Sequence, residues 1–278
     1  MPKRESNVVG REFGNGLRAA IAKTGLTQRK LAEELDWDES KISDAVNGKG
    51  GIDVHELEVL LAYCRVPLDE RRHLVALFLE AREKGFLLFP EDGVPDQLRT
   101  LINHEKESTE IVAWSMILVP GLLQTTEYAH AVAEEGPHEK EDVPKVVAAR
   151  VARAEILRPG RTFTFLVHEQ ALWLPVGGEE VWREQLAHLM RMSVRKYINF
   201  HVVPSSIGAH AGVSGDFRVM RFPKYPPLVY VESLNCGLFL DDKDTVALYE
   251  DRVKRLATVA LDREQSRAVI DDILEGLQ

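Results

Sequence analysis

The feature that most constrains the fold is a pair of short amphipathic helices joined by a tight turn within residues 26–48. Thr27 supplies a hydroxyl that suits the N-cap of the first helix. Ala32 is small at the point where two helices must approach closely. In the second helix Ile42 and Val46 are four residues apart and therefore share one face. The pattern predicts a helix-turn-helix in which the second helix packs along one side and leaves the other side exposed.

The exposed side of that second helix carries short polar side chains. A helix of this kind fits the major groove of DNA, where its N-terminal side chains reach base edges. The start of the first helix, with its free N–H groups, suits a phosphate. The alternative is a helical bundle used for protein contacts. The residues predicted to contact DNA are Thr27, Gln28, Arg29, Glu39, Ser40, Lys41, Ser43, Asp44, Asn47 and Lys49.

The chain divides by pattern into two domains, as its 278 residues suggest. Residues 1–84 read as five short helices. Residues 85–95 hold two glycines and two prolines and are predicted to be a linker, docked on a surface by its apolar residues. Residues 96–278 mix helical and strand patterns, so the overall class is α+β, with a C-terminal sheet of about five strands. The strands are predicted at 109–115, 163–168, 199–203, 216–222, 228–233 and 237–241, and the helices at 96–108, 121–136, 140–157, 179–195, 243–260 and 262–276.

The N-terminal domain resembles the XRE-type, lambda-repressor-like helix-turn-helix regulators. Two departures stand out: Asp36 where the family usually has glycine in the turn, and Asp44 where relatives commonly carry a basic residue. The resemblance implies a sequence-specific DNA-binding transcription regulator that is not an enzyme. It rests on Gly25–Gln28, Leu31–Ala32, Leu35, Ser40–Ser43 and Asn47–Gly48.

The C-terminal domain resembles the large domain that follows this helix-turn-helix in regulators of Streptomyces and other actinobacteria, the WhiJ-like developmental regulators. The resemblance implies that the domain senses a signal, and it implies a small BldB-like partner protein, in an arrangement likened to toxin–antitoxin pairs. It rests on Leu118–Thr125, Arg150–Arg153, His168–Leu172, Pro175–Gly178, Gln185–Leu189, Val203–Pro204, Gly208–Gly212, Tyr230–Glu232 and Gly237–Asp241.

The charge of the chain is distributed unevenly. The whole chain has a net charge of -9, which argues against a protein coated in nucleic acid and against a polybasic membrane binder. Residues 1–50 hold nine Lys or Arg and eight Asp or Glu, a net charge of +1, so the acidic excess lies beyond them. Because phosphate neutralisation supplies most of the affinity for DNA, one such domain binds weakly. We therefore expect a homodimer on two half-sites of double-stranded DNA.

Several other classes of protein are disfavoured by the sequence. Cys64 and Cys236 lie far apart and in no metal-ligand spacing, which argues against a disulfide scaffold and against a zinc finger. The first residues include no apolar signal segment. The longest apolar run, 111–123, is too short to span a bilayer. We expect no metal, no cofactor and no membrane association, and a cytoplasmic protein that joins the nucleoid when bound to DNA.

Polar and aromatic residues near the ends of predicted strands suggest a pocket for a ligand or partner in the C-terminal domain. No tight His spacing, nucleophile elbow or glycine-rich phosphate loop accompanies them, which disfavours a catalytic domain. The helix start at Thr125 suits an anion, although plain architecture is the commoner role. The small residues of 205–215 predict a mobile loop that closes over the pocket, or an ordinary connection. The predicted pocket residues are Glu169, Trp173, His201, His210, Tyr230 and Glu232, beside His168.

The sequence thus favours a dimeric regulator whose C-terminal domain dimerises and is controlled by a small partner protein or a small molecule. The alternative is an antitoxin-like protein that mainly sequesters a partner and regulates its own promoter. A catalytic C-terminal domain is the third possibility.

Overall fold

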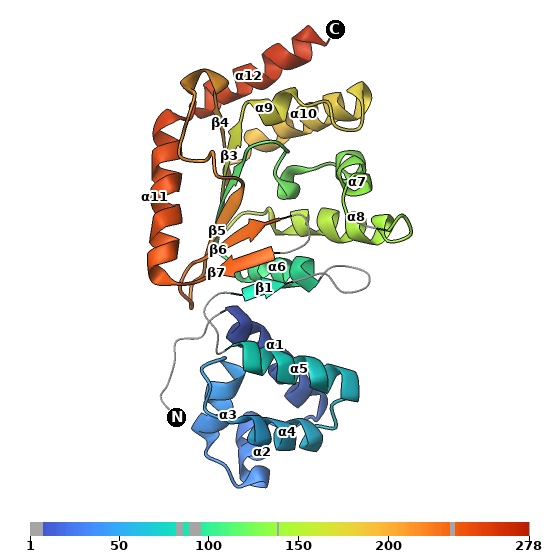
Figure 1. Ribbon diagram of the computed structural model, residues 1–278, viewed down its shortest axis with the longest axis vertical. Helices are drawn as coiled ribbons and strands as arrows, with labels where there is room; N and C mark the ends of the chain where they lie inside the picture. Colours follow the sequence, from blue (N-terminus) through green and yellow to red (C-terminus); the bar gives the residue numbers. More distant parts are fainter. Residues whose placement is uncertain (1–7, 82–85, 89–95, 138, 234–236, 278) are drawn as a thin grey trace. The chain divides into compact units, whose positions relative to one another are not determined.

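The computed structural model describes residues 8–81, 86–88, 96–137, 139–233 and 237–277. The chain forms two compact units, Met1–Phe86 and Leu87–Gln278. The first is helical and the second is built on a sheet, which confirms the α+β class (Figure 1). Most of the predicted linker, 85–95, lies outside the described residues, and its described part forms a short strand, β1 (Phe86–Leu88).

The N-terminal unit contains the five predicted helices, which surround one apolar core. Gly25, with φ of 73°, follows the first helix in the left-handed conformation that glycine adopts most readily. The core includes Phe13, Leu17, Ile42 and Leu57, each at most 2% exposed. The helices are α1 (Val8–Lys23), α2 (Gln28–Leu35), α3 (Glu39–Val46), α4 (Val54–Tyr63) and α5 (Leu68–Glu80).

The C-terminal unit is organised by one seven-stranded sheet in the order β1-β7-β6-β5-β2-β3-β4. Strands β2, β3 and β4 run parallel to one another. Strand β5 pairs antiparallel with β2, β6 with β5, and β7 with β6. All six predicted strands are present, and β1 adds a seventh to a sheet expected to have about five. The remaining strands are β2 (Glu110–Ser115), β3 (Thr162–His168), β4 (Ile198–Val203), β5 (Phe217–Arg221), β6 (Leu228–Glu232) and β7 (Gly237–Leu240).

Helices cover both faces of this sheet. Figure 1 shows α11 along one face and α6, α7, α8 and α10 on the other. The predicted helix 121–136 is in fact a 3-10 turn, η1 (Gly121–Leu123), followed by α7, because the chain is extended at Gln124 and Thr125. The helices are α6 (Asp96–Glu107), α7 (Thr126–Glu134), α8 (Val143–Ala152), α9 (Gln170–Trp173), α10 (Glu179–Ser193), α11 (Lys243–Val259) and α12 (Arg263–Gly276), with 3-10 turns η2 (Arg153–Ile156) and η3 (Ser205–Ile207).

The two faces of the sheet have separate cores, because successive residues of a strand point to opposite sides. Trp114, Val219 and Val229 belong to the core beneath Val246 and Leu256 of α11. Their strand neighbours therefore face the other layer of helices. Within the described residues, no helix is long and apolar enough to cross a membrane.

Candidate DNA interface and charged cluster

The turn between α2 and α3 has the geometry that a helix-turn-helix requires. The Thr27 hydroxyl accepts a hydrogen bond from the Lys30 N–H at 3.1 Å and so caps α2. Asp36 takes the left-handed conformation, with φ of 55°, and Trp37 N–H donates to the Ala32 carbonyl at 2.9 Å. Asp tolerates this conformation better than most residues with a Cβ, so the departure from glycine at position 36 does not break the turn.

The position of α3 is fixed from behind by α1. A Cβ at Gly14 would collide with the carbonyl oxygen of Val46 at the end of α3, so glycine permits this close approach. Arg18 donates to the same Val46 carbonyl at 2.8 Å and to Asn47 Oδ1 at 3.4 Å. A guanidinium at a helix C-terminus satisfies free carbonyls and complements the helix dipole. Neither Gly14 nor Arg18 was predicted as part of the site.

The residues predicted to contact DNA differ in how exposed their side chains are. Exposed residues lie at the start of both helices and after α3. Lys41 forms an ion pair with Glu56 of α4, and its Nζ lies 5.0 Å from the centre of the Trp37 ring. Asn47 donates to the Ser43 carbonyl at 2.7 Å. Thr27, Arg29, Glu39, Ser40 and Lys49 are exposed, whereas Gln28, Lys41, Ser43, Asp44 and Asn47 are half-buried.

The second half of the predicted α3 face is partly covered by the chain that follows it. A Cβ at Gly51 would lie 3.1 Å from Asp44 Cβ and 3.3 Å from the Lys41 carbonyl oxygen. Ile52, 1% exposed, anchors this segment in the core. The exposed part of α3 is therefore its N-terminal turn, which presents Glu39 and Ser40.

The six residues predicted to line one C-terminal pocket lie in three separate places. Glu169 and His210 lie at the ends of the parallel strands, each beside His168, and Trp173 lies next to Glu169. His201 Nδ1 lies 2.9 Å from the Leu261 carbonyl oxygen, away from that group. Tyr230 and Glu232 belong to β6, where Tyr230 faces the layer opposite α11. The structure therefore does not bring the six residues together, because strand order and strand face decide which side chains meet.

The loop predicted to be mobile, 205–215, is held by several hydrogen bonds. Trp114 Nε1 donates to the Gly212 carbonyl at 3.0 Å, and Arg252 Nη1 donates to the Ala211 carbonyl at 2.7 Å. Glu169 Oε2 accepts from the Ser205 N–H at 2.7 Å, and this hydrogen bond lowers the pKa of Glu169. These bonds pin the loop onto the sheet and argue against closure over a ligand.

Two histidines stack where this loop meets the sheet. The rings of His168 and His210 are 5.2 Å apart, and the Trp114 indole lies edge-on to both. Burial lowers the pKa of each histidine, and the neighbouring His168 lowers that of His210 further. Both rings are therefore held in the neutral form near pH 7. Among the described residues, no three His, Cys, Asp or Glu side chains gather in a way that suits a metal ion.

The helix start at Thr125 has architectural partners instead of a free anion site. The Thr125 hydroxyl accepts from the Tyr128 N–H at 3.3 Å, and its own N–H donates to Gln185 Oε1 at 2.7 Å. Gln185 is fully buried and also donates to the Leu123 carbonyl at 2.8 Å.

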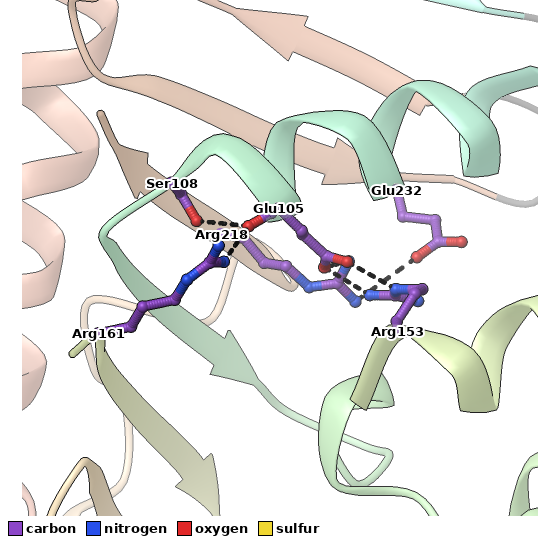
Figure 2. A network of polar contacts seen from close by, with 6 residues as sticks. All are labelled: Glu105, Ser108, Arg153, Arg161, Arg218 and Glu232. Carbon is purple, nitrogen blue, oxygen red and sulfur yellow. Dashed lines mark hydrogen bonds and ion pairs between the residues drawn. The ribbon is translucent and has the colours of Figure 1, made fainter. Parts of the chain in front are cut away.

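A cluster of charged side chains, of which the sequence analysis named only Glu232 as a site residue, lies on the sheet face opposite α11 (Figure 2). Arg153 of η2 donates to both oxygens of Glu105 of α6, at 2.8 and 2.7 Å. The two side chains are 4% and 1% exposed. Burial disfavours the charged form of Arg153, but the charge and hydrogen bonds of Glu105 prevail and raise its pKa. Arg218 of β5 lies between Glu105 and Glu232, 3.8 and 3.9 Å from their nearest oxygens.

The family of the chain is shown by comparison with known proteins. Residues 98–272, more than half of the chain, match a family described as a domain of unknown function, DUF5753. The chain belongs to the DUF5753 family. In this DUF5753 protein, residues 12–74 also match a helix-turn-helix domain, which contains the α2–turn–α3 geometry. A comparison with curated proteins found no match. The helix-turn-helix domain indicates a DNA-binding regulator, and such regulators act by binding DNA.

Proposed function

We propose that this DUF5753 protein is a sequence-specific transcription regulator of the XRE type whose α3 enters the major groove. The observation that carries the proposal is the pairing of an exposed N-terminal turn on α3 with a C-terminal end fixed by Arg18. A recognition helix reads bases mainly with its N-terminal residues. Glu39 and Ser40 would face the bases, and Thr27 and Arg29 of the preceding helix would face phosphates.

The weak charge of the reading domain supports binding as a homodimer. Residues 1–50 carry a net charge of +1, and the lysine of α3 is paired with Glu56. Few phosphates are neutralised by one copy, so two copies on adjacent half-sites supply the missing affinity. The protein would act in the cytoplasm, at the nucleoid when bound to DNA.

Control through the C-terminal domain completes the proposal. An effector changes DNA binding when it binds one dimer geometry better than another. The resemblance to WhiJ-like developmental regulators of Streptomyces supports a small BldB-like partner protein as the effector, with a small molecule as the other candidate.

An antitoxin-like role is the second candidate, and the low charge of the reading domain is the observation that favours it. Such a protein sequesters its partner and occupies little DNA beyond its own promoter. Mapping its binding sites across the genome separates the two functions, since a broader regulator occupies many promoters.

Selection of duplexes from a random-sequence pool by the full chain tests the DNA-binding proposal. We expect one consensus with two related half-sites. S40A should change the preferred base at one position of each half-site. R29A should weaken binding to all sequences alike and reduce the salt dependence of binding by about one unit of slope. K145A, which removes an exposed lysine of the C-terminal unit, is the control for loss of charge. Recovery of no consensus, or an unchanged preference in S40A, would refute the assignment of α3.

A further inference from the structure

A pocket of about 540 Å³ lies beside the charged cluster, where β2 ends and β5 begins. Ile117, Leu118 and Phe217 give it an apolar wall, and Arg218, Tyr230 and Glu232 lie at its polar end. A smaller pocket of about 160 Å³ shares Arg218 and Glu232. It continues the space toward Arg150 and Arg153. The larger volume lies within the usual range of small-molecule sites, about 300–1,000 Å³.

Arg218 is a half-buried cation whose Nη1 donors are unused. Its side chain is 15% exposed, and its nearest carboxylate oxygens, on Glu105 and Glu232, are 3.8 and 3.9 Å away. These separations exceed those of a hydrogen bond. Its Nη1 is buried and has no hydrogen-bond partner among the residues that the structure describes. Since a guanidinium carries five donors and no acceptor, only a group that accepts hydrogen bonds can satisfy the free donors of Arg218.

Tyr230 provides a second donor at the same end of the pocket. The residue is 1% exposed, and its hydroxyl has no hydrogen-bond partner within the described part of the chain. Arg218 Cζ lies 5.6 Å from the centre of the Tyr230 ring. Burial raises the pKa of Tyr230, so the phenol keeps its proton and remains a donor. Leaving such a group unpaired costs free energy, which a ligand oxygen would recover.

The carboxylates around the pocket leave the Nη1 donors of Arg218 unsatisfied. Both oxygens of Glu105 are occupied by Arg153. Arg150 also lines the smaller pocket and lies near enough to Glu232 for their charges to interact. Asp216 also lines both pockets, and its Oδ1 accepts a hydrogen bond from the Met116 N–H at 2.9 Å. Glu105 and Asp216 are therefore engaged by other donors, and the free donors of Arg218 remain for a ligand.

We propose that this pocket binds a small organic anion with an apolar body, its carboxylate between Arg218 and the Tyr230 hydroxyl. The apolar body lies against Ile117, Leu118 and Phe217. Hydrogen bonds between ionised partners are about twice as strong as neutral ones, so the charge of the ligand decides the affinity. That this anion is the signal of the regulator rests on the function proposed above, whereas its binding does not.

Equilibrium dialysis of the full chain with 2-naphthoate tests the site, with neutral 2-naphthalenemethanol as the matched compound. We expect saturable binding of one naphthoate per chain, about tenfold or more tighter than the alcohol. R218Q should weaken naphthoate binding by about tenfold or more. I117E places a negative charge on an exposed position of the pocket wall, so it should reduce binding without disturbing the core.

R221Q is the control, because Arg221 is on the same strand and pairs with Glu110 and Glu250 outside the pocket. It should leave naphthoate binding unchanged. Binding that is weaker than about 1 mM, unsaturable, or equal for naphthoate and the alcohol overturns the proposal. Retention of full binding in I117E and folded R218Q does so as well. Measuring affinity for the selected DNA duplex with and without naphthoate separates binding at the pocket from regulation through it. If naphthoate binds without altering the affinity for DNA, the binding site is supported and its regulatory role is refuted.

Discussion

Substitution of Glu105 by Gln removes a carboxylate that pairs with both Arg153 and Arg218. The change keeps the shape of the side chain and leaves two guanidinium groups, 4% and 15% exposed, facing a neutral amide. Removing one member of a buried ion pair costs about 3–5 kcal/mol, because the remaining charge is buried and uncompensated. Since Glu105 is 1% exposed and serves two arginines, we expect E105Q to fall at the upper end of that range.

R153M should cost less than E105Q, because Glu105 then keeps Arg218 at 3.8 Å. The matched control is the Arg191–Glu184 pair, which has the same chemistry at 2.6 Å but side chains that are 56% and 58% exposed. E184Q should therefore cost under about 1 kcal/mol.

Urea unfolding followed by tryptophan fluorescence measures these differences. In a W37F background the other three tryptophans, Trp114, Trp173 and Trp182, all lie in the C-terminal unit, so the signal reports on that unit. With a slope of about 2 kcal/mol per M, E105Q should lower the midpoint by about 2 M. A shift equal to that of E184Q, or smaller than that of R153M, would refute the idea that Glu105 is the shared counter-charge.

Three further outcomes are expected. G14A should weaken DNA binding and lower the unfolding free energy of the N-terminal unit, because the added Cβ collides with a backbone carbonyl. In G16A the added Cβ contacts only the end of a leucine side chain, so both losses should be smaller in the same assays. Burial lowers the folded-state pKa of His168 and His210, so the unfolded chain takes up protons first as the pH falls. The unfolding free energy should therefore fall below about pH 6.5. H168Q/H210Q should reduce the dependence of the unfolding free energy on pH between pH 7 and about pH 5.5 in urea titrations. Glu56 accepts a hydrogen bond from the Asp53 N–H in the capping box of α4, and Gln can do the same. E56Q therefore keeps the cap but releases the α3 lysine, so mobility-shift titrations should show tighter DNA binding and a steeper salt dependence, by about one unit of slope.

The helix-turn-helix was accessible from sequence because its signals are local. Thr27, Ala32 and Ile42 follow the 3.6-residue period and the capping preference within some twenty positions. The contacts that decide which of its side chains are available are long-range. Arg18 reaches the end of α3 across 28 positions, and Glu56 pairs with a lysine 15 positions away. No local pattern marks such partners.

The C-terminal site shows the same limit more strongly. Each strand was predicted from its own composition, but the face of a residue relative to other strands depends on strand order. His201 shares a face with the core beneath α11, whereas Tyr230 points to the opposite side, so the two never line one cavity. Glu105 and Arg153 are separated by 48 positions, and only the folded sheet brings them together.

The hydrogen bond between the Trp114 indole and the Gly212 carbonyl has a consequence for where this fold binds molecules. In sheets with parallel strands, ligands usually enter the crevice beyond the carboxyl ends of those strands. Here the indole, the stacked imidazoles and the pinned loop fill that position at β2 and β3. A Cβ at Gly212 would collide with the indole, so the plug is tightly fitted. The space between the ends of β2 and β3 is thereby filled, and chemical diversity among proteins built on this plan should concentrate on the other side of β2, where the pocket meets β5 and β6.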